Sequence, residues 1–299
     1  MLWTALAYAA NPTCTEWEPS QLVTNVADMP SSESSGLAVV SGGFLTIDDA
    51  GGDASMYRFD AAGEFLATIP VEGATNTDWE DLAVTPCEEG TCAWIADIGD
   101  NDENRATVTI WRAPITNQMT FAGAGCVVSY EDGPHDAEAL LAFADGSFRI
   151  VAKDPDEAKV YYIDALVCDG STNVFTKETE LVLGASVTGG SVSADGALVA
   201  LRSLETGWVF GGCALDWAAT PVDLLFVGEL QGESVDFDPD GSLWSSSEGD
   251  KFELHVLECV STETPVCEDE CACGSGMTVG WFGASLAVWG LSRRTRRQR

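Results

Sequence analysis

Carboxylate side chains recur at one position in three separate segments of this 299-residue chain. Glu80, Glu138 and Glu233 each stand at the start of a short apolar segment that is typical of a β-strand, and Asp97 ends another such segment. Carboxylates that converge repel one another unless a cation or a basic group compensates them. These residues therefore predict a metal site with oxygen ligands, for which Ca²⁺ is the foremost candidate.

Two further strand-like segments end in basic residues, Lys153 and Arg202. In a metal-dependent hydrolase they are the expected catalytic groups, because a cation near the metal stabilises developing negative charge. His135, beside Asp136, is a further candidate as a general base. A structural alternative stays open for each residue. The Glu side chains can accept backbone N–H groups of neighbouring repeats, the two basic residues can simply pair with them, and Asp97–Asn101 can be a turn with Asx hydrogen bonds.

The elements that must position these side chains are short strands rich in apolar, β-branched and aromatic residues. Between Gly36 and Leu257 they form five successive groups, four of them with four strands and the last with three, and Gln21–Val26 can supply the missing strand. Asp-Gly pairs at 145–146, 195–196 and 240–241 mark hairpin turns between first and second strands. We expect an all-β fold, a single β-propeller of five (alternatively six) four-stranded blades closed by the N-terminal strand. A β-sandwich is the competing architecture.

In a propeller the starts of first strands and the ends of second strands lie on one face, so the Glu and basic residues share one opening. The fourth repeat has Gly190 where the others have Glu, which argues against a fully symmetric ring of ligands.

The charge balance of the chain is strongly acidic. It contains 48 Asp and Glu against 14 Lys and Arg, a net charge of −34, and five of those basic residues fall in the last seven positions. Such a surface repels phosphate backbones and excludes nucleic acid as a partner. A divalent cation is the expected partner of a monomer, although acidity can also serve solubility alone.

Ten cysteines indicate an oxidising compartment and disulfide bonds. Cys87 and Cys92 flank a glycine turn between two strands, which predicts a bridge across a hairpin. Cys168, Cys213 and Cys259 each follow a third strand, but the sequence does not identify their partners.

The two ends of the chain predict export and attachment. Residues 1–10 read as the remnant of a signal peptide, from a misplaced start or a truncated sequence. The propeller is expected over residues 14–260, a Cys-rich linker over 261–276 and a short transmembrane tail with an Arg cluster over 277–299. Cysteines, a short apolar span and terminal arginines resemble the MYXO-CTERM sorting tail of deltaproteobacterial surface proteins. That resemblance implies cleavage near the cysteines and lipid attachment at Cys271 or Cys273, with an ordinary single-pass anchor as the alternative.

Four motifs in the body resemble a family of exported bacterial propellers of unknown function: Asp-Trp-Glu-Asp-Leu-Ala, Ala-Asp-Ile-Gly-Asp-Asn, Gly-Pro-His-Asp-Ala-Glu-Ala-Leu and Gln-Gly-Glu-Ser-Val. The resemblance covers about residues 31–258 and implies the fold, but it carries no known reaction. We expect an envelope-anchored binding or interaction module with Ca²⁺ at the channel mouth. The alternative is a metal-dependent hydrolase of esters or phosphoesters, similar in layout to phytase-like or lactonase-like propellers.

Overall fold

The computed structural model describes residues 13–30, 33–115, 121–211, 215–229, 231–248 and 252–263, which belong to one compact unit within residues 1–266. Every regular element in these residues is a β-strand, so the predicted all-β class is confirmed. The same residues contain no helix with the length and apolar character that crossing a bilayer requires.

Most strands form five antiparallel groups of four, which we call units I to V in chain order. Unit I contains β3 (Ser34–Val40), β4 (Gly43–Asp48), β5 (Ser55–Phe59) and β6 (Phe65–Glu72). Unit II contains β7 (Trp79–Cys87), β8 (Gly90–Asp97), β9 (Val108–Pro114) and β11 (Ala124–Tyr130). Unit III contains β12 (Ala137–Ala142), β13 (Phe148–Ala152), β14 (Ala158–Ile163) and β15 (Thr172–Leu181). Unit IV contains β16 (Gly189–Val192), β17 (Leu198–Arg202), β18 (Thr206–Gly211) and β19 (Val222–Leu225). Unit V contains β20 (Gly232–Phe237), β21 (Leu243–Ser247), β22 (Phe252–Leu257) and β2 (Gln21–Val26).

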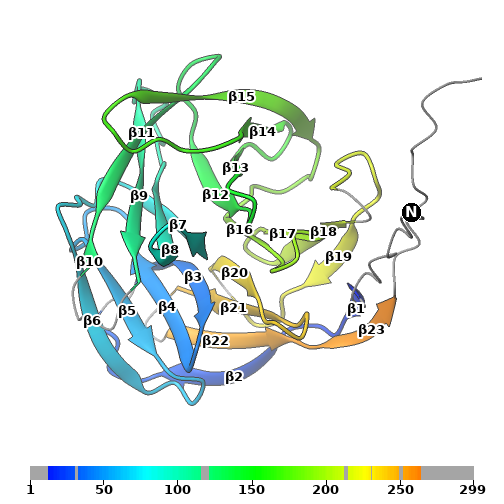
Figure 1. Cartoon of the computed structure of the whole chain (residues 1–299). Coiled ribbons are helices and arrows are strands. Elements are labelled where there is room, and N and C mark those ends of the chain that lie inside the picture. Colours follow the sequence, from blue (N-terminus) through cyan, green and yellow to red (C-terminus); the bar gives the residue numbers. More distant parts are fainter. Residues whose placement is uncertain are drawn as a thin grey trace, which may run out of the picture. The chain divides into compact units, whose positions relative to one another are not determined.

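The first strands of the five units form a closed cycle (Figure 1). β3 packs against β7, β7 against β12, β12 against β16, β16 against β20, and β20 back against β3. Strand β2, from the N-terminal end of the described chain, pairs antiparallel with β22 and completes unit V. This is the arrangement of a β-propeller, and the predicted closure by Gln21–Val26 is confirmed.

Three further strands connect or extend the units. β10 (Phe121–Ala122) pairs parallel with β6 and so extends unit I. In addition, β11 of unit II pairs parallel with β15 of unit III, which joins these two units into one eight-stranded sheet. β1 (Thr13–Trp17) pairs antiparallel with β23 (Cys259–Glu263) as a separate two-stranded sheet. Strand β23 therefore extends three residues beyond the expected end of the propeller at residue 260.

Apolar side chains hold neighbouring units together. The inner strand β12 is buried at all six positions, as expected of a strand covered on both faces, whereas the outer strand β15 has many exposed positions. Separate apolar clusters fill the junctions between consecutive units. A fifth cluster, with Phe59 of unit I packed on Phe252 of unit V, closes the cycle. Because each unit packs on two neighbours, the positions of the first strands are fixed around one centre.

The three predicted Asp-Gly turns are present. Gly146, Gly196 and Gly241 have φ values of 90°, 72° and 91°, a region that favours glycine. In each turn the preceding aspartate accepts a backbone N–H two residues further on. These turns set the register between first and second strands in units III, IV and V.

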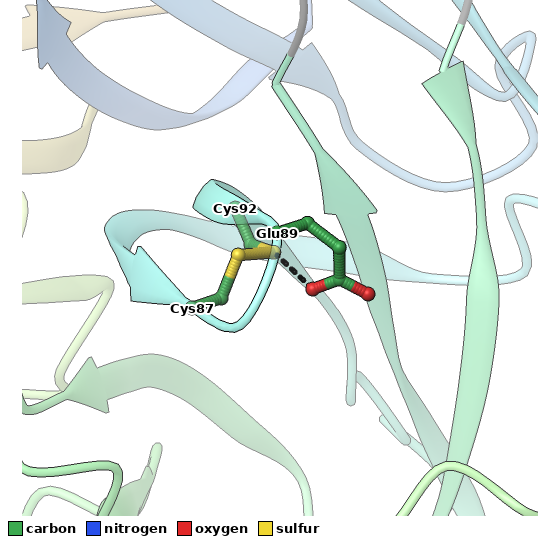
Figure 2. Close-up of side chains that lie close together, drawn as sticks. All are labelled: Cys87, Glu89 and Cys92. Atoms are coloured by element: carbon green, nitrogen blue, oxygen red, sulfur yellow. Dashed lines mark hydrogen bonds between the residues drawn. A yellow bond between two sulfur atoms is a disulfide. The ribbon is translucent and has the colours of Figure 1, made fainter.

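Three disulfide bonds lie in the described residues. The predicted Cys87–Cys92 bridge is present at the tip of the β7–β8 hairpin. Figure 2 shows the carboxylate of Glu89 beside it, 3.8 Å from the Cys92 sulfur. Cys168 pairs with Cys126, and Cys259 pairs with Cys14 across 245 residues. These bonds indicate an oxidising, extracytoplasmic environment.

Candidate metal centre at the channel mouth

The three predicted glutamates occupy the same unusual backbone position. In unit II, Trp79 pairs with Asp97 and Asp81 pairs with Ala96, so Glu80 is an extra residue in β7. Glu138 in β12 and Glu233 in β20 lie in equivalent register shifts. Each glutamate is thus the additional residue of a β-bulge at the start of a first strand. Bulges re-aim side chains and are common beside functional sites.

Unit IV departs from this pattern as its sequence suggests. Gly189 pairs with Arg202 and Gly190 with Leu201 without a register shift, so unit IV has neither the bulge nor the carboxylate. A Cβ atom on Gly189 would lie 2.4 Å from the carbonyl oxygen of Glu233 in unit V. The glycine at this position allows the close approach of the neighbouring unit. The predicted asymmetry of the mouth is therefore a feature of the fold.

Glu80 belongs to two groups of carboxylates. One carboxylate oxygen from each of Asp49, Asp78 and Glu80 lies within 4.8 Å of the others, and the same holds for Glu80, Asp136 and Glu138. We call these the Asp49 triad and the Glu138 triad. Every donor is a carboxylate oxygen, which suits a hard cation such as Ca²⁺ and not a metal that prefers sulfur or imidazole.

Burial and mutual repulsion raise the pKa values of these groups. Glu80 is 5 % exposed, and burial followed by the charge of Glu138 raises its pKa well above the ordinary value. Burial likewise raises the pKa of Glu138, although the ammonium group of Lys153 opposes the shift. Burial also raises the pKa of Asp49 and of Asp78. A bound cation would offset the repulsion and lower these pKa values.

Glu233 and Glu248 of unit V complete the acidic surface of the mouth. Burial, then the charges of Glu138 and Glu248, raises the pKa of Glu233 to about 8. Burial, then the charges of Asp49 and Glu33, raises the pKa of Glu248 to about 7. Glu80 and Glu138 lie together in one triad, whereas Glu233 lies outside both triads and influences the mouth through its charge.

Lys153 reaches the Glu138 triad, as the sequence pattern predicted. Its ammonium group forms an ion pair with the Glu138 carboxylate and lies 4.0 Å from Asp136. The backbone N–H of Lys153 donates to the carbonyl of Asp136, which holds the two segments together. The Glu138 triad thus contains an internal cation. The Asp49 triad contains no such ion pair among the described residues.

Asp97 lies next to the triads but is engaged elsewhere. Its carboxylate forms an ion pair with Arg105 at 2.7 Å and accepts backbone N–H groups of Thr77 and Asp78. A Cβ on Gly99, two residues later, would lie 2.1 Å from Glu80 Oε1. The predicted ligand Asp97 therefore orders the loop, and Gly99 lets the loop approach Glu80.

Arg202 does not reach the solvent of the mouth. It is fully buried and pairs with Glu229 at 3.0 Å, and its other nitrogens donate to backbone carbonyls of Ser203 and Leu204. The guanidinium also lies 4.0 Å above the ring of Phe226. A substrate has no open path to this group, and Arg202 acts here as a buried counter-ion.

Asp81 and Asp236, which are outside the predicted site, accept backbone N–H groups of a neighbouring unit. Asp81 accepts the N–H of Leu140 at 2.7 Å and so links units II and III. Asp236 accepts the N–H of Val39 at 2.7 Å and links units V and I. The inter-unit role considered for the glutamates thus belongs to Asp81 and Asp236.

Asp49, Asp78 and Asp136 were also outside the predicted ligand set. A signal for two of them exists in the sequence, because Asp78-Trp-Glu80 and Asp136-Ala-Glu138 repeat the same spacing. Cys271 and Cys273, together with residues 1–10 and 277–299, lie outside the described residues.

A pocket of about 530 Å³ adjoins the Glu138 triad. Asp136 and Lys153 line both, and His135 lies in the pocket wall. We call this cavity the His135 pocket. Its volume is within the range of about 300–1,000 Å³ typical of small-molecule sites.

The chain matches no protein-family model and no curated protein. Among solved structures it is similar to the PQQ-bound aldose sugar dehydrogenase from Streptomyces coelicolor, with 13% identity over 82% of this chain and 99% of that chain, at a TM-score of 0.49. A glucose dehydrogenase has 9% identity over 82% of this chain and 100% of that chain (TM-score 0.48). A streptogramin B lyase has 12% identity over 80% and 97% (TM-score 0.44). We therefore argue function from the site alone.

Proposed function

We propose that the five units are the blades of a five-bladed propeller that acts outside the cytoplasm as a binding module and holds Ca²⁺ at its channel mouth. The observation that carries this proposal is the position of Glu80, a buried carboxylate shared by the Asp49 triad and the Glu138 triad. Two bulged first strands, in different units, bring these oxygens together. Repulsion among these carboxylates destabilises the fold unless a cation offsets it.

The cation should bind at the Asp49 triad in preference to the Glu138 triad. Its oxygens have no ammonium partner among the ion pairs of the described residues, whereas Lys153 already compensates the Glu138 triad. Ca²⁺ takes six to eight oxygen ligands, so waters or backbone carbonyls must complete the shell. The flexible geometry of Ca²⁺ accommodates such a mixed set better than Mg²⁺ does.

Attachment to the cell envelope is the second part of the proposal. Three disulfides support a location outside the cytoplasm. The sorting-tail pattern with Cys271 and Cys273 motivates lipid anchoring at the envelope. Mass spectrometry of the protein from its native membrane tests this part, since an unmodified, full-length C-terminus contradicts it.

A metal-dependent hydrolase of esters or phosphoesters is the second candidate. The His135 pocket favours it, because a substrate there would lie beside Lys153 and the carboxylates. Lys153 would stabilise developing negative charge. Arg202 has no part in this version, since its guanidinium is fully buried. Turnover of p-nitrophenyl esters or phosphates that needs Ca²⁺ and falls in Lys153→Met would favour the hydrolase.

Calorimetric titration of the chelator-stripped full chain with CaCl₂, with a parallel melting curve, tests the cation site. We expect one site with a dissociation constant below about 10 μM and a raised melting temperature, because a ligand of the native state stabilises it. Weak heat that is spread over many sites and abolished by salt would mean that the acidity is diffuse surface charge.

A further inference from the structure

The wall of the His135 pocket carries more negative charge than positive. The pocket lies where segments of units II, III and IV meet, and its volume is about 530 Å³. Its charged lining residues are two lysines, Lys153 and Lys159, and four carboxylates, Glu103, Asp136, Asp154 and Glu157. A ligand that enters the pocket therefore meets an excess of carboxylate oxygens, which attract positive charge.

Neither lysine presents an uncompensated positive charge to a ligand. The Lys153 ammonium forms an ion pair with Glu138 and lies 4.0 Å from Asp136. The Lys159 ammonium forms an ion pair with Asp132 at 3.2 Å. Because Glu138 and Asp132 do not line the pocket, these pairs use up the positive charge of the wall without compensating most of its carboxylates. An anion would have to break one of these pairs, and the net charge of −34 repels it as well.

Three of the wall carboxylates, those of Glu103, Asp154 and Glu157, form no ion pair with any described residue. Two groups of acidic side chains in the described residues could hold a metal ion at the mouth, and neither group includes any of these three carboxylates. Their oxygens are thus not gathered with a third ligand around one point. A single metal ion needs such a gathered set, whereas an extended molecule with several positive groups can pair with carboxylates on separate segments.

A buried hydroxyl beside this wall also lacks a partner. Tyr130 is 7 % exposed, and its ring lies edge-on to the ring of His135 with centroids 5.5 Å apart. Its hydroxyl has no hydrogen-bond partner among the described residues. Burial raises the pKa of this hydroxyl, and three charged groups act on it as well, Arg105, Asp136 and Asp100. The hydroxyl therefore lies toward the acidic side of the pocket, where its oxygen can accept a hydrogen bond from an ammonium group.

We propose that the His135 pocket binds an aliphatic diamine or polyamine. The volume is far larger than a metal ion needs and suits a small organic molecule. Ammonium groups joined by methylene chains can reach carboxylates on different segments, as the ammonium groups of Lys153 and Lys159 already do in this wall. This inference deepens the binding-module proposal by naming its ligand class, and it rests on that proposal. It does not require Ca²⁺, although Asp136 and Lys153 border both sites.

Calorimetric titration of the full chain at about 0.15 M salt tests this, because salt screens attraction to diffuse surface charge. The probes are spermidine, putrescine and butylamine, which carry successively fewer amino groups, with inorganic phosphate and glucose as the anionic and neutral comparison. Each titration is run with chelator and again with Ca²⁺. We expect saturable binding at one site, with an affinity that falls from spermidine to putrescine to butylamine. Binding of phosphate or glucose but of no amine, or no saturable binding of any amine, overturns the proposal.

The double variant Glu103→Gln, Glu157→Gln removes two exposed wall charges and keeps the shape of both side chains. We expect it to weaken spermidine binding by at least about fivefold, the effect of two lost, partly exposed ion pairs. The matched control is Glu72→Gln, Asp223→Asn, which removes two exposed charges from the outer strands β6 and β19 and should bind normally. An equal loss in both double variants would mean that net charge alone attracts the amine, and it overturns the proposal.

The same titrations keep the polyamine pocket apart from the cation site. Saturable spermidine binding by a chain that binds no Ca²⁺ would overturn the cation site alone. Ca²⁺ binding by a chain that shows no saturable amine binding would overturn the present inference alone.

Discussion

Glu80 and Glu138 occupy the same bulged position in neighbouring units, and the charge of Glu138 adds to burial in raising the pKa of Glu80. Neither side chain has more than 5 % of its surface exposed. Two buried acids that meet in this way cannot both ionise without a compensating charge. The first three predictions test what that charge is and how the fold holds the pair.

Glu80→Gln should remove Ca²⁺ binding and leave the fold intact. The amide keeps the shape of the carboxyl group but withdraws one anionic ligand from both triads. We expect the Ca²⁺-induced rise in melting temperature to disappear, while the apo protein melts no earlier than wild type. Glu178→Gln, in a partly exposed ion pair with Arg149, is the control and should retain the rise. Unfolding of the Glu80 variant would instead indicate a structural role.

Gly99→Ala should weaken Ca²⁺ binding, because it adds a side-chain atom to the loop backbone that lies against the ligands. A Cβ at this position would lie 2.1 Å from Glu80 Oε1 and 2.5 Å from Asp78 Oδ2, so both carboxylates must move. We expect Ca²⁺ affinity, measured by calorimetry, to fall by at least about tenfold, equivalent to about 1.4 kcal/mol. The control is Asp102→Ala, which changes an exposed residue of the same loop and should leave the affinity close to that of wild type. Undiminished affinity in Gly99→Ala would exclude Glu80 and Asp78 as ligands.

The apo protein should be more stable in mild acid than in base. Burial raises the folded-state pKa of Asp236 to about 6 and that of Asp81 to about 8, and the pKa values of Glu248 and Glu233 lie at about 7 and about 8. A raised folded-state pKa means that the folded chain binds the proton more tightly than the unfolded chain. The resulting stabilisation is complete below the unfolded-state pKa of about 4 and is lost as pH rises through the folded-state values.

Melting curves in chelator between about pH 5 and about pH 9 measure this effect. We expect the melting temperature to fall steadily from about pH 5 to about pH 8, and Ca²⁺ to reduce the fall by replacing protons at the mouth. A melting temperature that rises over this range would mean that these carboxyl groups are ionised and compensated in the apo fold.

Much of this architecture follows from local sequence. Asp-Gly turns and alternating strand segments predicted the units, and Gln21–Val26 was identified as the closing strand because unit V lacked one. The Glu position was visible in the sequence because it recurs at the start of three of the first strands. The Asp49 triad could not be identified from the sequence, because Asp49 and Glu80 meet only when units I and II pack together. The burial of Arg202 was equally hidden: its partner Glu229 lies in a connection between units, where no periodic pattern marks it.

Arg202→Met should destabilise the fold strongly without a direct effect on the mouth. The change leaves the Glu229 carboxylate, itself 2 % exposed, without its cation. Removing one member of a buried ion pair costs about 3–5 kcal/mol. Arg149→Met, which breaks the partly exposed pair with Glu178, should cost about 1 kcal/mol or less. Denaturant unfolding compares the two, and similar losses in both would show that the buried pair contributes no more than the exposed one.

The Cys14–Cys259 bond should contribute more to stability than the hairpin bond Cys87–Cys92. The first joins cysteines 245 residues apart and fastens β1 to β23, whereas the second spans five residues. A cross-link restricts the unfolded chain more as its loop lengthens, with about 4.7 kcal/mol expected for a loop of roughly 100 residues. We expect the double variant Cys14→Ser, Cys259→Ser to lose about 4 kcal/mol or more in the free energy of unfolding, and Cys87→Ser, Cys92→Ser to lose less. Chemical denaturation of both variants measures this. A larger loss in the hairpin variant would mean that native contacts around Cys87 and Cys92, and not chain entropy, dominate.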